Sequence, residues 1–329
     1  MQNKQIEVVG VGACNLDIVA FVPNLPKVEE KINARKYESP HAAGVCLDAL
    51  TQLARLGIKC GMIGKIGGDA LGGVFKKEMA KDNIDCSQLI TVEEERSSFC
   101  WVIVDEQGNR CHVVFSMEQK GFLTEEEIEE REDYIKQAKV YHAEILQMPL
   151  VPMTKGAEIC KKCDILVSFD LDIAPKYIYQ YGYATQEELM AMIKLTDFLK
   201  VCKDGVFELI SEENNMEKAA AKLLNIGPRI AVITMGGEGC VVAYENSLHK
   251  VETFRMPAFK VPVKDTTGAG DSFQGAFIYG ILKGWEVKKI TFFANACAAL
   301  ACNKIGARNM PTFEEIQKFL QKQGWKSIK

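Results

Sequence analysis

Short runs of β-prone residues alternate with helical patterns along most of this chain of 329 residues. The expected strands occupy 6–12, 60–66, 140–146, 165–170, 198–202 and 230–235. The helical patterns occupy 44–56, 69–82, 125–138, 150–162, 186–195, 215–226, 269–283, 287–304 and 312–323. Strands that alternate with helices pair in parallel, with the helices packed on both faces of the sheet. The pattern therefore predicts an α/β fold built on a doubly wound, mostly parallel sheet.

Two segments interrupt this alternation. One is 20–40, and the other is the alternating pair 99–104 and 111–115, joined by the turn-forming residues 105–110. Two alternating runs with such a connection predict a β-hairpin. A chain of this length can hold one large α/β domain or two small ones.

Charge and composition exclude several classes of protein. The net charge of −4 gives no electrostatic reason to expect nucleic acid or an anionic membrane as a partner. The apolar run near residue 6 is too short to span a membrane and lacks the layout of a signal peptide, so we expect a cytoplasmic protein. Among the twelve cysteines only Cys160 and Cys163 form a CxxC pair, and a zinc site would need a second pair.

The stretch 265–273 reads Asp-Thr-Thr-Gly-Ala-Gly-Asp-Ser-Phe, between an apolar, β-prone run at 254–263 and a helical pattern. The motif is therefore expected to open a helix. The small residues Gly268, Ala269 and Gly270 let the backbone approach a ligand, and the unpaired N–H groups of a first helical turn suit phosphate. Asp271 would repel phosphate as a ligand, but it could act as a base for a hydroxyl that attacks phosphorus. Alternatively, the glycines merely permit a tight turn and Asp271 starts the helix.

These residues, together with 42–57, 64–72 and 233–239, resemble the signatures of the ribokinase-like (PfkB) carbohydrate kinase family. The resemblance spans residues 8 to 312 in the expected order. It implies a kinase that transfers a phosphoryl group from ATP, with Mg²⁺, to an alcohol of a sugar. It also implies that Asp271 is the catalytic base and that the amides of 268–270 form an anion hole. In this family, segments at 18–40 and 97–117 would build a small β-sheet lid on a single domain over 1–329, and the lid often pairs with a second subunit as a homodimer.

The first expected strand ends in a Gly-x-Gly sequence, which invites a dinucleotide-binding interpretation. Asn15 replaces the third glycine and no helical pattern follows, so substrate binding is the better interpretation. Side chains at the carboxyl ends of strands point into the ligand crevice of such sheets, where Asn15 and Asp17 would offer donors and acceptors to a polyol. The family resemblance gives Asp17 the role of holding sugar hydroxyls.

The stretch 42–49 resembles the family's first signature, in which two glycines precede a sugar-binding Asn. Gly44 is the second of these glycines, Ala43 stands for the first and Asp48 for the Asn. An ionised Asp accepts hydrogen bonds but cannot donate them, so the sugar contact here must differ from the usual one. Asp48 could instead face backbone amides at the start of a helix. At 64–72, we expect Asp69 to cap the following helix and to belong to the scaffold. We likewise expect Thr124 to cap the helix that begins at 125, with Glu127 completing a capping box.

The resemblance also places a nucleotide site and a cation site. The nucleotide site would contain the residues Thr234, Gly236, Gly239, Asn295, Gly306 and Ala307. Backbone carbonyls near four residues would hold a monovalent cation such as K⁺, namely Asp265, Thr267, Ala301 and Gly306.

The chain departs from the family where an Asn-x-x-Glu sequence usually serves magnesium and phosphate. Cys202 and Gly205 stand in place of the Asn and the Glu. Asp204 or Glu208 could help to hold the metal, and Lys203 could contact phosphate.

Two further functions are compatible with this sequence. A nucleoside kinase of the same family would need an aromatic stack for a base, and the candidates are Phe21, Phe99, Trp101 and Phe115. A catalytically weak relative that binds a small ligand would fit the change at Cys202 and Gly205. The intact Asp271 argues against that relative, because a binding protein needs no base beside an anion hole.

Overall fold

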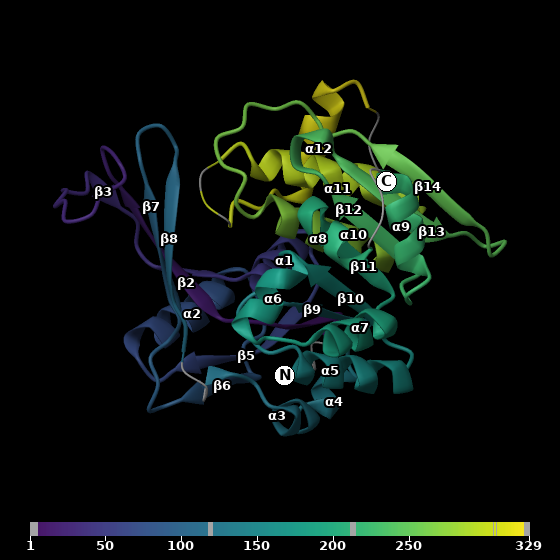
Figure 1. The fold of residues 1–329 in the computed structure, drawn as a ribbon, viewed down its shortest axis with the longest axis horizontal. Coiled ribbons are helices and arrows are strands. Elements are labelled where there is room, and N and C mark those ends of the chain that lie inside the picture. Colours follow the sequence, from purple (N-terminus) through teal and green to yellow (C-terminus); the bar gives the residue numbers. More distant parts are fainter. Residues whose placement is uncertain (1–5, 118–120, 211–214, 305, 307, 326–329) are drawn as a thin grey trace.

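A nine-stranded sheet forms the centre of the computed structural model, which describes residues 6–117, 121–210, 215–304, 306 and 308–325. Its strand order is β14-β13-β12-β11-β10-β9-β1-β5-β6 (Figure 1). The strands are β1 (Val8–Val11), β5 (Cys60–Gly67), β6 (Leu89–Val92), β9 (Val140–Glu144), β10 (Leu166–Leu171), β11 (Phe198–Cys202), β12 (Ile230–Thr234), β13 (Cys240–Glu245) and β14 (Val251–Met256). All pairs from β6 to β12 are parallel, and β13 and β14 add an antiparallel edge. The predicted α/β class is confirmed.

Both faces of the sheet are covered, as a parallel sheet requires. Val9 and Val11 of β1 face one hydrophobic core, while Val8 faces a second core on the other side of the sheet. The first core is completed by helices α3 (Glu125–Glu129), α4 (Glu132–Ile135), α5 (Val151–Lys162), α6 (Pro175–Tyr181), α7 (Gln186–Leu195), α8 (Lys203–Leu209) and α9 (Met216–Leu224). The second is completed by α1 (Val45–Arg55), α2 (Ala70–Lys81), α10 (Ala269–Leu282), α11 (Val287–Ala301) and α12 (Phe313–Lys322).

The sequence predicted the helices with three differences. The helix expected over 125–138 is two short helices, because Arg131 leaves the helical conformation between them. Helices α6 and α8 were not predicted. The capping residues were placed correctly: Thr124 forms a capping box, and Asp69 accepts the Gly72 N–H. In the part of the chain that the structure describes, no helix has the length and apolarity to cross a bilayer.

The prediction of β structure over 254–263 is wrong for the second half of that segment. Strand β14 ends at Met256, and 257–263 has no regular secondary structure. Pro257 and Pro262 lack the N–H that a strand ladder needs, which explains the early end. The edge strand β6 and the strand β13, which lies between β12 and β14, were not predicted.

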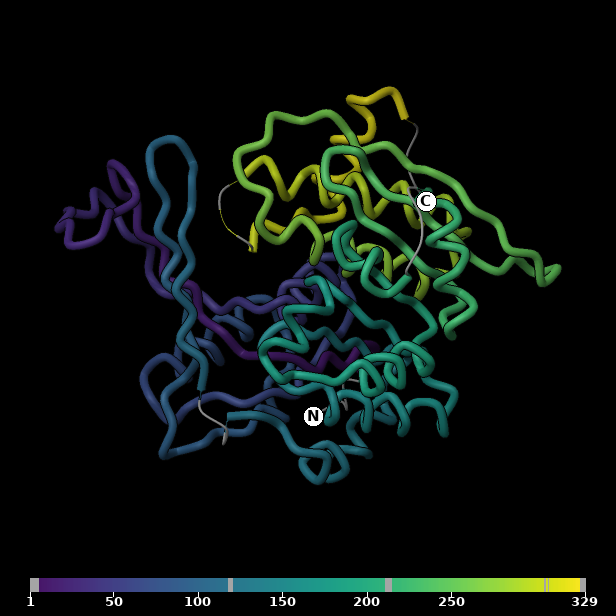
Figure 2. The backbone as a smooth tube through the Cα atoms, in the orientation of Figure 1, coloured from purple at the N-terminus to yellow at the C-terminus, as the bar shows by residue number. Residues whose placement is uncertain are grey.

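A second, smaller sheet stands beside the main body (Figures 1 and 2). It consists of β2 (Asn15–Phe21), β3 (Lys36–Tyr37), β4 (His41–Ala43), β7 (Phe99–Val104) and β8 (Arg110–Phe115). The predicted hairpin is confirmed as β7 and β8, which pair Phe99 with Phe115. The Gly-x-Gly sequence at the end of β1 leads into strand β2 and not into a helix. The structure therefore agrees with the sequence analysis, which sets the dinucleotide-binding interpretation aside.

Candidate active site

The 268–270 motif begins helix α10, as predicted. Gly268 precedes the first helical residue with φ of 78°, a conformation that favours glycine. Ser272 fixes this start, since its N–H donates to the Gly268 carbonyl at 2.8 Å and its hydroxyl donates to Gln52 Oε1 at 2.7 Å. Both interactions orient the first turn of α10, so that Gly268, Gly270 and Asp271 line one cavity.

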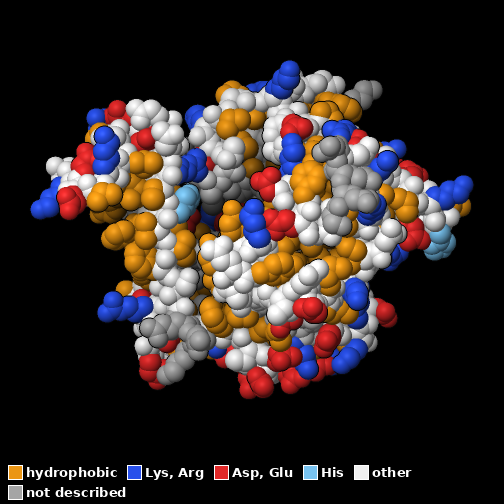
Figure 3. All heavy atoms as spheres, viewed as in Figure 1, with side chains coloured by type: hydrophobic (Ala, Val, Ile, Leu, Met, Phe, Trp, Pro, Cys, Tyr) orange, Lys and Arg blue, Asp and Glu red, His pale blue; other side chains and the backbone are white. Residues whose placement is uncertain are grey.

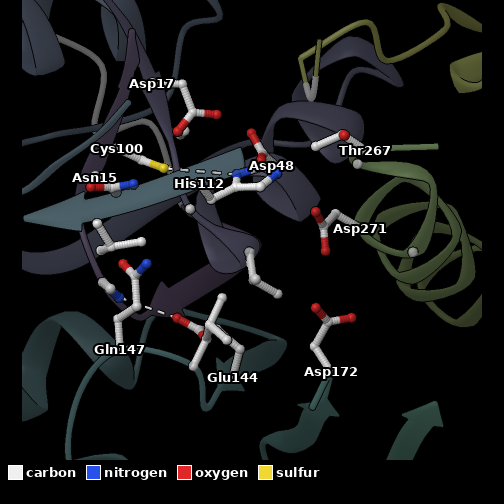
Figure 4. Close-up of a pocket in the computed structure, with 18 of the residues that line it drawn as sticks. Asn15, Asp17, Asp48, Cys100, His112, Glu144, Gln147, Asp172, Thr267 and Asp271 are labelled. Atoms are coloured by element: carbon white, nitrogen blue, oxygen red, sulfur yellow. Dashed lines mark hydrogen bonds between the residues drawn. The ribbon is translucent and has the colours of Figure 1, made fainter. Parts of the chain in front are cut away.

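This cavity has a volume of about 690 Å³. Figure 3 shows the molecule hollowed between the small sheet, at the left, and the main body. In Figure 4 the labelled side chains come from separate elements and surround a common space. Polar residues on its wall include Asn15, Asp17, Asp48, His112, Ser116, Glu144, Gln147, Asp172, Thr266, Thr267 and Asp271.

Asp271 is only 8% exposed. Burial, and then the neighbouring carboxylates of Asp172 and Asp48, raise the pKa of Asp271 above its ordinary value, while Lys200 acts in the opposite direction. A carboxylate in such a place is a stronger base than one in water, which suits the acceptance of a proton from an alcohol.

Lys200 lies beneath this end of α10 and is 1% exposed. Its Nζ is 2.9 Å from Asp170 Oδ1 and 3.4 Å from Asp172 Oδ1. A Cβ atom added to Gly270 would lie 3.2 Å from the same Nζ, so the ammonium group adjoins the 268–270 backbone. Burial alone would lower the pKa of Lys200, but the surrounding carboxylates outweigh it and keep the side chain cationic. Sequence reasoning missed this group, although a lysine within a predicted buried strand was a usable signal.

The four residues expected to bind substrate are brought together on the cavity wall: Asn15, Asp17, Gly44 and Asp48. Gly44 has φ of 130°, and a Cβ there would lie 2.6 Å from the Ala13 carbonyl oxygen. Oδ1 of Asp48 has no hydrogen-bond partner among the described residues and can contact a ligand, while a hydrogen bond from the Gly44 backbone acts to lower the pKa of the same carboxyl. Burial raises the pKa of Asp48 to about 8.

Glu144 is a second residue that the sequence did not reveal. It ends strand β9 and is 1% exposed. Oε1 accepts the Ala13 N–H at 3.2 Å, whereas Oε2 has no partner among the described residues. Burial raises the pKa of Glu144 to about 8, and Asp170 and Asp172 add to the effect. A polar residue at the carboxyl end of a predicted strand was the signal that could have found it.

Of the expected nucleotide residues, Thr234, the glycines after it and Asn295 lie near the antiparallel strands of the main sheet, whereas Gly306 contacts Asp265. Thr234 ends β12, and the turn after it contains Gly236 (φ 55°) and Gly239 (φ 92°). Asn295 of α11 directs its Nδ2 at the carbonyl oxygens of Met256 and Pro257, at 3.5 and 3.4 Å. A Cβ on Gly239 would lie 2.0 Å from the same Met256 oxygen, so the turn and α11 meet there. Ala307 lies outside the described residues.

Asp265 connects the segments expected to hold a monovalent cation. Its Oδ1 accepts the Thr267 N–H at 2.7 Å, and its Oδ2 accepts the Gly306 N–H at 2.8 Å. Arg110, from β8 of the small sheet, is 2.7 Å from Asp265 Oδ1 and also contacts the Thr267 hydroxyl. Ala301 ends the helix that leads to Gly306.

The departure at Cys202 and Gly205 falls at the start of α8. Cys202 precedes the helix and provides no side-chain cap, and Gly205 is buried. Glu208 accepts the Lys176 N–H at 2.6 Å, and neither it nor Asp204 lines the cavity. Asp170, Asp172 and Asp271 instead bring three carboxylate oxygens within 4.8 Å of one another, so this group could hold a metal ion.

Comparisons with known proteins agree with this geometry. A family model described as "pfkB family carbohydrate kinase" matches residues 5–313. The chain is 28% identical over 332 residues to a 5-dehydro-2-deoxygluconokinase of Bacillus subtilis, covering 98% of each chain. It is 25% identical to the protein of that name from Geobacillus thermodenitrificans, covering 97% of this chain and 94% of that one.

Solved structures share the fold. A ribokinase from Thermotoga maritima gives a TM-score of 0.81 at 23% identity, covering 96% of this chain and 99% of that one. A candidate ribokinase II from E. coli, in complex with ATP and Mg²⁺, gives 0.83 at 24% identity with the same coverage.

Proposed function

The chain belongs to the pfkB family of carbohydrate kinases, and we propose that it transfers the γ-phosphoryl group of ATP to a hydroxyl of a sugar or sugar-like alcohol. The observation that carries the assignment is the position of Asp271, a buried carboxylate at the first turn of α10, beside Gly268 and Gly270 on the wall of a large cavity. Because ATP is its phosphoryl donor, we assign the enzyme to the cytoplasm.

The proposed reaction uses Asp271 as the base. The acceptor oxygen attacks the γ-phosphorus and its proton passes to Asp271, while the bond to the oxygen of the leaving ADP breaks. The amides of Gly268, Ala269 and Gly270 would stabilise the charge on the migrating group. The positive φ of Gly268 supports this role, since it turns the chain into α10 at the cavity wall.

ATP would bind beside Thr234, Gly236, Gly239 and Asn295, with Gly306 and Ala307 bordering the adenine. The contacts that join Asn295, the Gly239 turn and the Met256 carbonyl support a single site there. The contacts of Asp265 with Thr267 and Gly306 likewise support a carbonyl site for K⁺ between these segments and Ala301.

Magnesium fits beside the carboxylate of Asp172, because hard divalent cations prefer oxygen ligands; of its two neighbours, Asp170 is already paired with Lys200 and Asp271 is assigned as the base. When bound, it would offset negative charge on the phosphates of ATP. Asp172 is the most exposed of the three carboxylates and adjoins Cys202, where the family usually shows an Asn.

Replacing Asp172 by Asn should therefore raise the magnesium concentration needed for half-maximal rate by several-fold. Titration of Mg²⁺ at saturating ATP measures the change. The matched variant Asp204→Asn alters an acid that does not line the cavity and should leave the titration unchanged. The same midpoint in Asp172→Asn as in the unchanged enzyme would contradict the assignment.

Asp17 should hold hydroxyl groups of the acceptor, because it lines the cavity on β2, away from the residues assigned to ATP. Asp17→Ala is expected to weaken sugar affinity by about tenfold or more, because hydroxyl groups of the bound sugar would lose a hydrogen bond to a charged group. Calorimetry with sugar and with ATP separates the two affinities. If only ATP binding suffered, Asp17 would belong to the nucleotide site.

Release of ADP in a coupled assay, across sugars, polyols and nucleosides, tests the function itself. Phosphorylation of a sugar or polyol would confirm the proposed sugar kinase activity. A preference for a nucleoside as acceptor would contradict it. Three of the four residues expected to stack a base do not support that alternative: Phe99 and Phe115 pack on each other, with ring centroids 4.4 Å apart, and Trp101 packs beside them. None of these three lines the cavity. The fourth, Phe21, lines a neighbouring cavity together with Asp17 and His112.

The small sheet is proposed as the lid of this single-domain enzyme. Hydrophobic side chains gather on it in Figure 3, and its exposed hydrophobic residues include Tyr37, Trp101, Val113, Val114 and Phe115. Exposed apolar strands of this kind favour pairing with a second copy. We expect sedimentation equilibrium to give the mass of a dimer, and Trp101→Glu to give that of a monomer. A monomeric mass for the unchanged chain at micromolar concentration would contradict the dimer.

A further inference from the structure

Carboxylates dominate the wall of the active-site cavity. Five of them line it, each from a different element or loop: Asp17, Asp48, Glu144, Asp172 and Asp271 (Figure 4). Among the described residues that line the same cavity there is neither lysine nor arginine. The basic side chain that does reach the wall is that of His112, which lies close enough to Asp17 to stabilise its charge.

Three arginine and lysine side chains near this cavity are already paired with acids, and a fourth, Lys264, lines a neighbouring cavity. Arg110 is held by Asp265 at 2.7 Å. Lys200 is held by Asp170 and Asp172. Arg308 lies behind Asp48, where it contacts Asp82 and the Ala42 carbonyl. An acidic group on a ligand could recruit one of these three paired cations only by breaking an existing pair.

The unpaired atoms of the wall are hydrogen-bond acceptors. Oδ1 of Asn15, Oδ1 of Asp48 and Oε2 of Glu144 are buried and have no partner among the described residues. Where the two carboxyls are ionised, all three atoms accept hydrogen bonds, and the hydroxyl or ammonium groups of a ligand can donate to them. A carboxylate or sulfonate brings only acceptor oxygens and a further negative charge, and like charges at short range repel strongly away from bulk water.

We infer that the acceptor substrate is a neutral or amino-bearing polyhydroxyl compound and not a sugar acid. The inference rests on the proposed kinase function and narrows its substrate class. It also separates this chain from its 5-dehydro-2-deoxygluconokinase relatives, whose printed name denotes an acid.

Matched series of compounds test this inference. Each series holds the hydroxyl configuration constant and changes one group, as in glucose, glucosamine and gluconate, or ribose and ribonate. With ADP release as readout, the neutral or amino member should exceed the acid by about 10- to 100-fold in kcat/KM. An acid that is the best member of its series would overturn the inference. If no member of any series is phosphorylated, the kinase function fails, and the labelling experiment below decides the charge of the cavity.

Removing negative charge from the cavity wall should weaken the preference for neutral substrates over acids. Glu144→Gln and Asp48→Asn preserve the shape of each side chain, so the ratio of acid to neutral turnover should rise in both variants. Glu314→Gln, on an exposed face of α12, should leave the ratio unchanged. An unchanged ratio in Glu144→Gln and Asp48→Asn together would overturn the proposed cause.

Labelling measures the charge of the cavity without any turnover. Ser116 is exposed and lines the cavity, so Ser116→Cys places a thiol on its wall. Cationic and anionic methanethiosulfonates of similar size are compared there and at the exposed Cys163 by peptide mass spectrometry. The ratio of cationic to anionic labelling should be at least about tenfold higher at position 116. An equal or lower ratio would overturn the inference, whether or not a substrate has been found.

Discussion

Replacing Asp271 by Asn should lower turnover by about 100- to 10,000-fold while ATP still binds. Asparagine keeps the size of the side chain and much of its hydrogen bonding but cannot accept the proton of the acceptor hydroxyl. Single-turnover and steady-state rates measure the loss, and calorimetry measures the affinity for ATP. Asp164→Asn, which changes an exposed acid, is the matched control. Near-normal turnover in Asp271→Asn would contradict the role of base.

The pH profile gives a second readout of the same residue. A base must be ionised to act, and burial raises the pKa of Asp271. The kcat/KM of the unchanged enzyme should therefore fall as the pH decreases, and the fall should begin at a higher pH than for an ordinary aspartate. The residual rate of Asp271→Asn should lack this acid limb. An acid limb that survives the substitution would belong to another group.

Lys200→Met should lower the free energy of unfolding by about 3–5 kcal/mol. Methionine fills a similar volume but leaves the buried Asp170 and its neighbour Asp172 without their cation. Urea denaturation measures the loss. Lys161→Met removes the partly exposed pair with Asp197 and serves as control, with an expected loss of about 1 kcal/mol or less. Equal losses in the two variants would show that the buried ion pair contributes no more to the free energy of unfolding than the partly exposed pair does.

The dependence of this loss on pH has a definite sign. Burial raises the pKa of Asp170 to about 7, even though Lys200 acts to lower it. Without Lys200 the folded state holds this proton to a higher pH than the unfolded state does. The stability of Lys200→Met should therefore fall as the pH rises from about 4, and the fall should continue to a higher pH than in the unchanged protein, because the loss of Lys200 raises the pKa of Asp170 further. Because Lys200 also lowers the pKa of Asp271, the acid limb of any remaining activity should move to higher pH.

The parts of the fold that the sequence could predict depend on local patterns. Alternation of strands and helices specified the parallel strands, and capping residues specified the starts of α2 and α3. Helix α8 was missed because it is only seven residues long and contains Gly205. The strand β13 was missed because its residues follow a glycine-rich turn that was interpreted only as a ligand loop.

Site residues that share a local motif could likewise be predicted, whereas those brought together by the sheet could not. Gly268, Gly270 and Asp271 lie within one short motif, so their spacing alone was informative. Glu144 and Lys200 are charged residues in apolar strands, a local signal that marks them as unusual but does not show which residues they contact. Strand order, which a single sequence does not specify, is what brings them to Asp271.

The central position of β1 has a consequence for the synthesis of the chain. Val8 pairs with Cys60 on one side and with Val140 on the other, so one edge of β1 remains without its strand until β9 has been made. The cavity wall is completed later still, because Asp271 is its last acid. Such distant pairings close slowly. A ribosome adding about 5–20 residues per second thus exposes an unfinished sheet for many seconds, during which neither substrate can stabilise the fold by binding a finished site.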